Sequence, residues 1–313
     1  MIDVHAHCLP RAYIEFLARY GRAHVPPGLP TATDAGVDIE SRLKRMDDAG
    51  VTMQVLSPPP AAYFESEADA VAAARLANDS QAELTRNYPA RFRAYVSLPL
   101  PHVEASLKEL ERGLDKLGMS GVTMLCSVIG RSVADPAFDP IYEEMSRRSA
   151  ALFFHPCLTG ICSPMINDFG LTSPVGPLLE DTVTVLHLIV RQIPRRFPNI
   201  RIIVPHFGGA LPMMVDRLDH QLRWHHPTLP EAPSVTARRF WYDTVAHGSR
   251  AALSCACRTL GADRLVPGSD YPVQLAHGDY KDAFTYIEQS GLSSRDIDLI
   301  LHRNARALFP TAL

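Results

Sequence analysis

Four short segments, spread over most of the chain, place histidine or aspartate at the end of an apolar run. They are Asp3-Val4-His5-Ala6-His7, Phe154-His155-Pro156, Pro205-His206-Phe207-Gly208-Gly209 and Gly268-Ser269-Asp270-Tyr271-Pro272. Divalent metals of borderline softness are bound by this mixture of imidazole and carboxylate ligands. A single His-x-His pair is weak evidence, and any one of these histidines alone could be a hydrogen-bonded core side chain. Four such segments together predict a metal site.

The elements that must bring these segments together alternate along the whole chain. Short apolar, β-branched runs predict eight strands, at residues 2–4, 51–56, 92–98, 121–125, 151–155, 201–204, 240–242 and 264–267. Apolar residues at three- and four-residue spacing predict helices at residues 39–49, 67–88, 103–117, 141–149, 178–197, 211–223, 249–260 and 280–289. Eight strands, each followed by a helix, predict an α/β fold: one domain over residues 1–313, built as a distorted (β/α)8 TIM barrel.

Two stretches lack this periodicity, and both follow a histidine segment. Residues 8–38, an insertion after the first strand, are rich in proline and glycine, and residues 157–177 follow the fifth strand. In a (β/α)8 barrel the loops after the strands lie at the C-terminal face, where the active site is built. We therefore expect both stretches to be active-site loops.

The strand ends predict where the four segments meet. Side-chain alternation directs His5 and His7 to the same side of the first strand. His155 ends the fifth predicted strand, His206 follows the sixth and Asp270 follows the eighth. Because the ends of parallel barrel strands converge above the barrel, we expect these side chains to surround one point there.

Composition and charge exclude several other classes of protein. The chain has 313 residues, 46% hydrophobic and 21% charged, which is ordinary for a globular protein. A net charge of −3 provides no basic surface for nucleic acid or for a membrane. We expect no signal peptide, because no charged region followed by an apolar stretch begins the chain. The six cysteines have no Cys-x-x-Cys spacing, and we expect reduced thiols in a cytoplasmic protein.

The segments also resemble a known family. The chain is similar to the amidohydrolase superfamily, of the amidohydrolase-2 type, and within it to the branch of metal-dependent decarboxylases. Nearly the whole chain takes part in the resemblance, which rests on residues 3–10, 46–51, 54–57, 197–200, 206–212, 268–272 and 304–309.

The resemblance implies roles for the histidines and aspartate. His5, His7, His155 and Asp270 would ligate one divalent metal with water at an open position, while His206 would act as the catalytic base or acid beside it. Asp270 could also handle a proton. Zinc suits this ligand set best, and manganese or iron would also fit. Two-metal relatives bridge their metals through a lysine on the fourth strand, but residues 121–125 contain none, which favours a single metal.

The implied chemistry is non-oxidative decarboxylation of a small unsaturated or aromatic carboxylic acid, using the metal-bound water and His206. The chain has no Gly-x-Gly-x-x-Gly motif for a nucleotide cofactor. The electron pair left by carbon dioxide would therefore be accepted by the substrate itself. One alternative is a hydrolase or hydratase that uses the same metal-bound hydroxide on an amide, ester, lactone or C–C bond. A barrel that keeps the metal site only for binding is the third reading.

Three further features bear on the substrate and on a partner. Arg217 stands where the resemblance implies an arginine that reaches across a homodimer to a substrate carboxylate, and a solvated helix arginine is the alternative. His247 follows the seventh predicted strand and could line the pocket. The relatives hold a second carboxylate with an arginine from the loop after the first strand. Residues 27–38 contain no Arg or Lys, so we expect a different acid as substrate.

Overall fold

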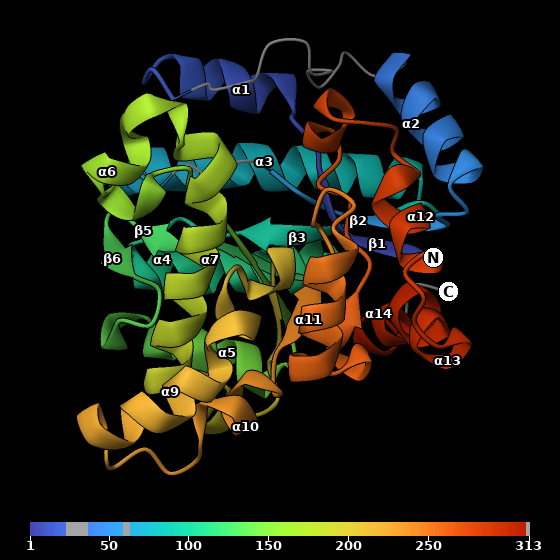
Figure 1. Ribbon diagram of the computed structural model, residues 1–313. Helices are drawn as coiled ribbons and strands as arrows, with labels where there is room; N and C mark the ends of the chain where they lie inside the picture. The colour runs from blue at the N-terminus through green and yellow to red at the C-terminus, as the bar shows by residue number, and fades with distance from the viewer. Residues whose placement is uncertain (23–36, 59–62, 311–313) are drawn as a thin grey trace.

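The computed structural model describes residues 1–22, 37–58 and 63–310 of the chain. Eight parallel strands form one sheet in the order β1-β2-β3-β4-β7-β8-β9-β10 (Figure 1). Their bounds are β1 Ile2–His7, β2 Met53–Ser57, β3 Phe92–Ser97, β4 Gly121–Leu125, β7 Ala151–His155, β8 Arg201–Val204, β9 Trp241–Asp243 and β10 Leu265–Val266. A small hairpin, β5 Ser127–Val128 and β6 Arg131–Ser132, follows β4.

The first and last strands close the sheet into a barrel. The amide of Val4 donates to the carbonyl of Pro267 at 2.9 Å, and the amide of His7 donates to the carbonyl of Tyr271 at 2.6 Å. The chain just beyond β10 is therefore hydrogen-bonded alongside β1. This arrangement confirms the predicted (β/α)8 barrel.

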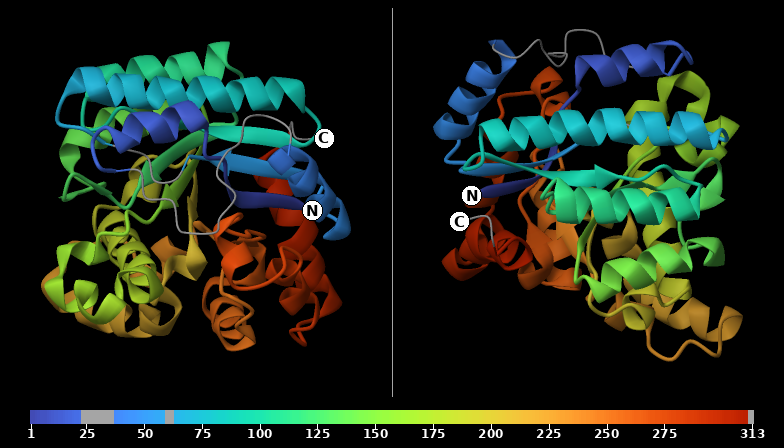
Figure 2. Two further views of the ribbon diagram at one scale, coloured as in Figure 1. Left: turned by 90° about the horizontal axis from the view of Figure 1, so that it is seen from above. Right: turned by 180° about the vertical axis from the view of Figure 1, so that it is seen from behind.

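Helices lie outside the sheet and run between its strands (Figures 1 and 2). Their bounds are α1 Arg11–Ala18, α2 Val37–Asp48, α3 Glu67–Asn87, α4 Val103–Glu111, α5 Asp139–Arg147, α6 Pro164–Asn167, α7 Thr172–Val190, α8 Ile193–Arg196, α9 Leu211–His225, α10 Pro233–Ala237, α11 Arg250–Leu260, α12 Asp282–Glu288, α13 Ser294–Asp298 and α14 Asn304–Leu308. Val4, Tyr95 and Phe153 belong to a buried apolar cluster that is formed mainly by the strands. Burial on both faces explains why the strands read as nearly continuous apolar runs.

The stretch at residues 157–177 is more regular than its composition predicts. It contains α6, and α7 begins at Thr172 instead of near residue 178. Pro174 lies in the first turn of α7, where its missing N–H costs no helical hydrogen bond, and Pro177 lies inside the helix. The predicted helix 178–197 also ends early, because Gln192 adopts a left-handed φ of 55° before α8 begins.

The insertion after β1 also contains a helix that was not predicted. The helix α1 buries Tyr13 and Leu17 in an apolar cluster with Phe64 and Ala70. Residues 23–36, which include most of the stretch without Arg or Lys, lie outside the described part of the chain. The different acid substrate that we expect from this stretch therefore stays a prediction from sequence.

Within the described residues, every helix is too short or too polar to cross a bilayer.

Candidate active site

One oxygen and three nitrogen atoms converge at the C-terminal end of the barrel. The Nε2 atoms of His5 and His155 lie 3.3 Å and 3.1 Å from Nε2 of His7. Oδ1 of Asp270 lies 2.9 Å from Nε2 of His7 and 3.3 Å from Nε2 of His5. All four atoms lie within 4.8 Å of one another. The structure therefore brings together four of the five side chains that were expected to surround one point.

Two strands and one loop position these atoms. His5 and His7 lie on β1, and both are buried. His155 ends β7. Asp270 follows β10 in a left-handed backbone conformation with φ 61°, and its amide donates to the carbonyl of His5 at 2.9 Å. The hydrogen bond ties the aspartate directly to the strand that carries the two histidines.

The other ring nitrogen of each histidine has an oxygen partner. Nδ1 of His5 lies 2.7 Å from a carboxylate oxygen of Asp243, and Nδ1 of His155 lies 2.9 Å from the carbonyl oxygen of Pro156. Because a carboxylate and a carbonyl only accept, both Nδ1 atoms carry the hydrogen. Nδ1 of His7 lies 3.0 Å from the hydroxyl of Ser57. Such outer partners orient imidazoles that bind metals.

This arrangement fits a bound cation. With hydrogen on Nδ1, the Nε2 atoms of His5 and His155 direct bare lone pairs toward the same point. Those lone pairs repel one another unless a positive charge lies between them. Zinc bonds of ~2.0–2.1 Å in tetrahedral geometry place neighbouring ligand atoms about 3.3 Å apart. Four of the six separations in the cluster, at 2.9–3.3 Å, are close to that spacing, and all six lie within 4.8 Å.

The electrostatics of the cluster also favour a cation. Burial lowers the pKa of His155 well below its ordinary value, which keeps this ring neutral and able to ligate. Burial alone would lower the pKa of His5, but Asp243 and Asp270 raise it to about 10. The two carboxylates thus attract a positive charge at His5, and a divalent ion can replace the proton.

His206 lies beside the cluster and outside it. It follows β8 in a left-handed conformation with φ 50°, and its amide donates to Asp243 at 2.8 Å. Its ring centroid lies 5.5 Å from that of His5. Its Nδ1 lies 2.7 Å from Asp181, and Nε2 forms no hydrogen bond within the described part of the chain. Burial opposes charge on His206, but Asp181 outweighs it and raises the pKa.

Two buried aspartates in this site were not predicted. Asp243, at the end of β9, hydrogen-bonds both the ring of His5 and the backbone of His206. An acidic residue at a predicted strand end is a signal that could have identified it. Asp181 lies in the middle of α7, where the sequence pattern marks only a helix. Its partner His206 becomes apparent only when α7 is placed against the loop after β8.

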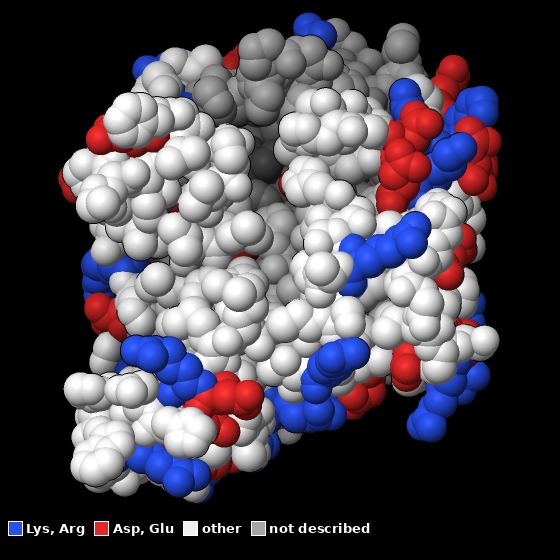
Figure 3. Space-filling view, viewed as in Figure 1, with Lys and Arg blue, Asp and Glu red and all other residues white. Residues whose placement is uncertain are grey.

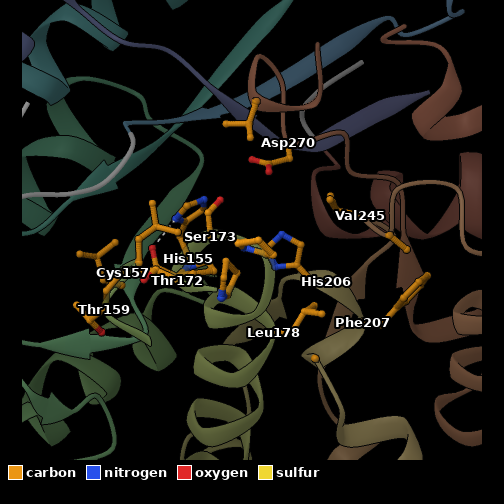
Figure 4. Close-up of a pocket in the computed structure, with 18 of the residues that line it drawn as sticks. His155, Cys157, Thr159, Thr172, Ser173, Leu178, His206, Phe207, Val245 and Asp270 are labelled. Carbon is orange, nitrogen blue, oxygen red and sulfur yellow. Dashed lines mark hydrogen bonds between the residues drawn. The ribbon is translucent and has the colours of Figure 1, made fainter. Parts of the chain in front are cut away.

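A cavity of about 1770 Å³ opens above this cluster. On the face shown in Figure 3 the hollow is surrounded mainly by residues other than Lys, Arg, Asp and Glu. In Figure 4, His155, Cys157 and Thr159 lie on the opposite side of the cavity from His206 and Val245. Residues of both predicted active-site loops line it, namely Leu9, Leu17, Arg22, Cys157, Leu158, Thr159, Thr172, Ser173, Pro174 and Pro177.

A buried glutamate holds one of these loops in place. The carboxylate of Glu180 accepts hydrogen bonds from the amides of Cys157, Leu158 and Thr159. Glu180 is in α7, one residue before Asp181. A carboxylate that accepts several backbone amides substitutes for solvation and fixes the chain around it. The same turn of α7 therefore anchors the cavity wall after β7 and contacts His206.

The remaining predicted site residues lie in different surroundings. His247 lines the cavity, and its ring is 5.0 Å from that of His277. Arg217 is exposed on α9 and does not contribute to the described cavity wall of its own chain. Arg22, which was not singled out from sequence, is the one Lys or Arg on the described wall. Its guanidinium lies over the ring of Phe64, 4.5 Å from the centroid, and donates to the carbonyl of Tyr63.

Comparisons with known proteins agree with this site. The sequence profile described as Amidohydrolase matches residues 2–311. A 2-amino-3-carboxymuconate-6-semialdehyde decarboxylase of Dictyostelium discoideum is 28% identical over 297 residues, covering 88% of this chain and 82% of its own length. The decarboxylase yanB of Aspergillus niger is 30% identical over 292 residues, covering 87% and 77%.

A solved structure shares the fold. The dihydroxybenzoic acid decarboxylase of a Polaromonas species, determined with manganese and the inhibitor 2-nitroresorcinol, superposes with a TM-score of 0.83 at 23% identity. The match covers 100% of this chain and 97% of that protein. The family match over nearly the whole chain, together with relatives that are decarboxylases, shows that this protein is an enzyme of the amidohydrolase family.

Proposed function

We propose that the protein is a metal-dependent, non-oxidative decarboxylase of a small aromatic or unsaturated carboxylic acid. The observation that supports this most is the cluster of His5, His7, His155 and Asp270 beside a paired His206 in one cavity. Two sequence relatives that match along most of the chain are decarboxylases. A hydrolase or hydratase is the less supported alternative.

We propose that the four clustered residues hold one divalent cation, with zinc as the first candidate and manganese or iron as alternatives. Manganese is bound in the Polaromonas relative, and three imidazoles with one carboxylate suit all three metals. When bound, the cation would act as a Lewis acid toward the oxygens of the substrate. Asp243, Ser57 and the carbonyl of Pro156 would keep the three rings oriented for it.

His206 is the proposed proton carrier. With the hydrogen of Nδ1 donated to Asp181, Nε2 is the ring atom available to the cavity. The proton on Nε2 adds to the ring carbon that bears the carboxylate. The bond between that carbon and the carboxylate then breaks, its electron pair returns to the ring, and carbon dioxide leaves, so that one proton is consumed per turnover. Asp270 is a second group at the site that could hold a proton.

The cavity wall supports a substrate with one carboxylate and an apolar body. Leu9, Leu17, Leu178, Phe207 and Val245 line the described wall, and Arg22 is the one strong cation there. Burying a second carboxylate against such a wall without a partner would reduce the binding free energy of the substrate by several kcal/mol. We propose that His247 contacts the substrate from the side of β9.

Carbon dioxide release tests this function. With one divalent metal per chain, we expect release of one equivalent from 2-hydroxybenzoates, including those with an alkyl group beside the carboxylate. We expect kcat/KM at least about tenfold lower for a dicarboxylic, muconate-like acid, because Arg22, the one Lys or Arg on the described wall, already donates to the carbonyl of Tyr63. A detector for evolved carbon dioxide with chromatography of the phenol product measures both. Turnover of amides, esters or lactones without carbon dioxide would contradict the proposal and favour the hydrolase.

We propose that the protein is a homodimer in which Arg217 reaches the site of the neighbouring subunit. Its exposure on α9, away from the cavity of its own chain, supports this arrangement. Free thiols at all six cysteines support a cytoplasmic location.

Exchange of Arg217 for alanine tests the dimer proposal. We expect a dimer by light scattering, and for Arg217→Ala a KM raised about 10–100-fold because a charge-assisted hydrogen bond to the carboxylate is lost. Arg223→Ala is the matched control, since Arg223 is also exposed but lies on another face of α9, and its KM should stay within twofold. A monomer with full activity would show that Arg217 is only a solvated surface residue.

A further inference from the structure

Asp181 is a buried carboxylate with few partners. It is fully buried, its Oδ2 lies 2.7 Å from Nδ1 of His206, and its Oδ1 accepts a weak hydrogen bond from the thiol of Cys126 at 3.4 Å. No Lys or Arg of the described chain pairs with it. A buried charge is costly unless a partner compensates it. In the structure that partner is the imidazole of His206.

The packing of α7 holds Asp181 at a fixed distance from His206. Thr182, the next residue, accepts a hydrogen bond from the amide of Ala210 at 2.8 Å. Thr184 donates to the carbonyl of Cys126 at 3.1 Å. Gly209 lies so close to α7 that a Cβ there would be 2.0 Å from the carbonyl oxygen of Leu178. The helix is thus joined to the loop that carries His206 on one side and to the end of β4 on the other.

Asp181 is separated from the cavity that His206 faces. His206 lines the cavity and its side chain is 10% exposed, whereas Asp181 is completely buried and does not contribute to the described wall. Because a carboxylate can only accept, the hydrogen of the neutral imidazole is on Nδ1. The lone pair of Nε2 is then directed to the substrate side.

We propose that Asp181 is a positioning residue for the reaction: it holds the ring of His206 in place and in the tautomer with hydrogen on Nδ1. Only the expected effect of Asp181 on turnover rests on the proposed function. The tautomer itself is a property of the protein that can be measured without a substrate. Asp181 is not expected to touch substrate or metal.

Asp181→Asn tests the effect on turnover. The amide matches the carboxylate in size but can donate to Nδ1 and so favour the opposite tautomer. The analogous aspartate-to-asparagine change in a serine protease triad lowers kcat by about 10⁴. We expect kcat to fall by about 10²–10⁴, with KM and metal content within twofold. Cys126→Ala, which removes the other partner of Asp181, is the matched control and should retain kcat within threefold.

Nitrogen-15 NMR of histidine-labelled, zinc-loaded protein tests the tautomer. The His206 signals are assigned by their loss in His206→Gln. At a pH high enough for the ring to be neutral, we expect a protonated Nδ1 and a bare Nε2 in the unmodified protein, and a mixed or reversed pattern in Asp181→Asn. A bare Nδ1 in the unmodified protein would overturn the proposal even if the variant fails to fold. So would a folded Asp181→Asn with kcat within threefold on an identified substrate.

The two proposals can fail separately. If no carboxylic acid is decarboxylated but the tautomer reverses in Asp181→Asn, the proposed reaction is wrong and the positioning of His206 by Asp181 stands. If decarboxylation is found but the tautomer is unchanged in Asp181→Asn, the positioning role is wrong and the reaction stands.

Discussion

His155→Ala is expected to abolish metal retention and activity together. His155 contributes one of the four converging atoms, and among the described residues its other nitrogen bonds only the carbonyl of its neighbour Pro156. Removing it should therefore affect the metal far more than the barrel. Loss of an outer-shell partner typically costs about 10–100-fold in metal affinity. We expect loss of a ligand to exceed this, and kcat/KM to fall by more than about 10⁴-fold.

Elemental analysis after dialysis, and competition with a chelator, measure this effect. The unmodified protein should retain about one divalent ion per chain, and the metal that restores activity to chelated protein identifies the preferred ion. Ser57→Ala is the matched control: it removes the outer partner of His7 and should weaken binding by only about 10-fold. Two ions per chain, or full metal retention by His155→Ala, would contradict the proposed site.

His206→Ala is expected to lose most activity while keeping its metal. His206 lies outside the cluster, so the four proposed ligands remain in place. Proton transfer by a positioned side chain contributes typically 10²–10⁴-fold to rate. We expect kcat to fall by that factor, because the proton at Nε2 is lost, with metal content within twofold.

Parallel measurement of kcat and bound metal distinguishes this role from that of a ligand. His220→Ala provides a control, because His220 is exposed on α9 and its Nδ1 lies 2.7 Å from the carbonyl oxygen of Asp216 in the same helix. Its kcat should be unchanged. If His206→Ala loses the metal as well, His206 is a ligand and its proposed role as proton carrier is wrong.

The barrel and its converging strand ends were predictable because they depend on local patterns. Period-two and unbroken apolar runs mark strands, three- and four-residue spacing marks helices, and their alternation leaves few arrangements open. Parallel strands in a barrel necessarily end on one face. His5, His7, His155 and Asp270 were therefore identifiable as neighbours from their places at the ends of β1, β7 and β10.

The predictions from sequence were wrong for two segments, the start of α7 and the helix α1, where the residue pattern did not indicate a helix. Residues 157–177 were predicted to be an irregular loop, yet α7 begins at Thr172. Pro174 lies in the first turn of α7, which tolerates proline, whereas Pro177 lies inside the helix. The helix α1 is short, and it is stabilised by burying Tyr13 and Leu17 against Phe64. Such contacts join residues about 50 positions apart in sequence and leave no periodic signal.

The sequence by itself determined the alternation of strands and helices that builds the barrel, and it placed His5, His7, His155, His206 and Asp270 at strand ends. The division of these five residues into four ligands and a proton carrier was implied by the family resemblance. Tertiary structure alone decided the partners that orient them. Asp243 pairs with His5 across 238 positions, and Asp181 pairs with His206 because α7 packs on the loop after β8. Local patterns encode backbone conformation and burial, but a pair of buried polar side chains is selected only when separate elements pack against each other.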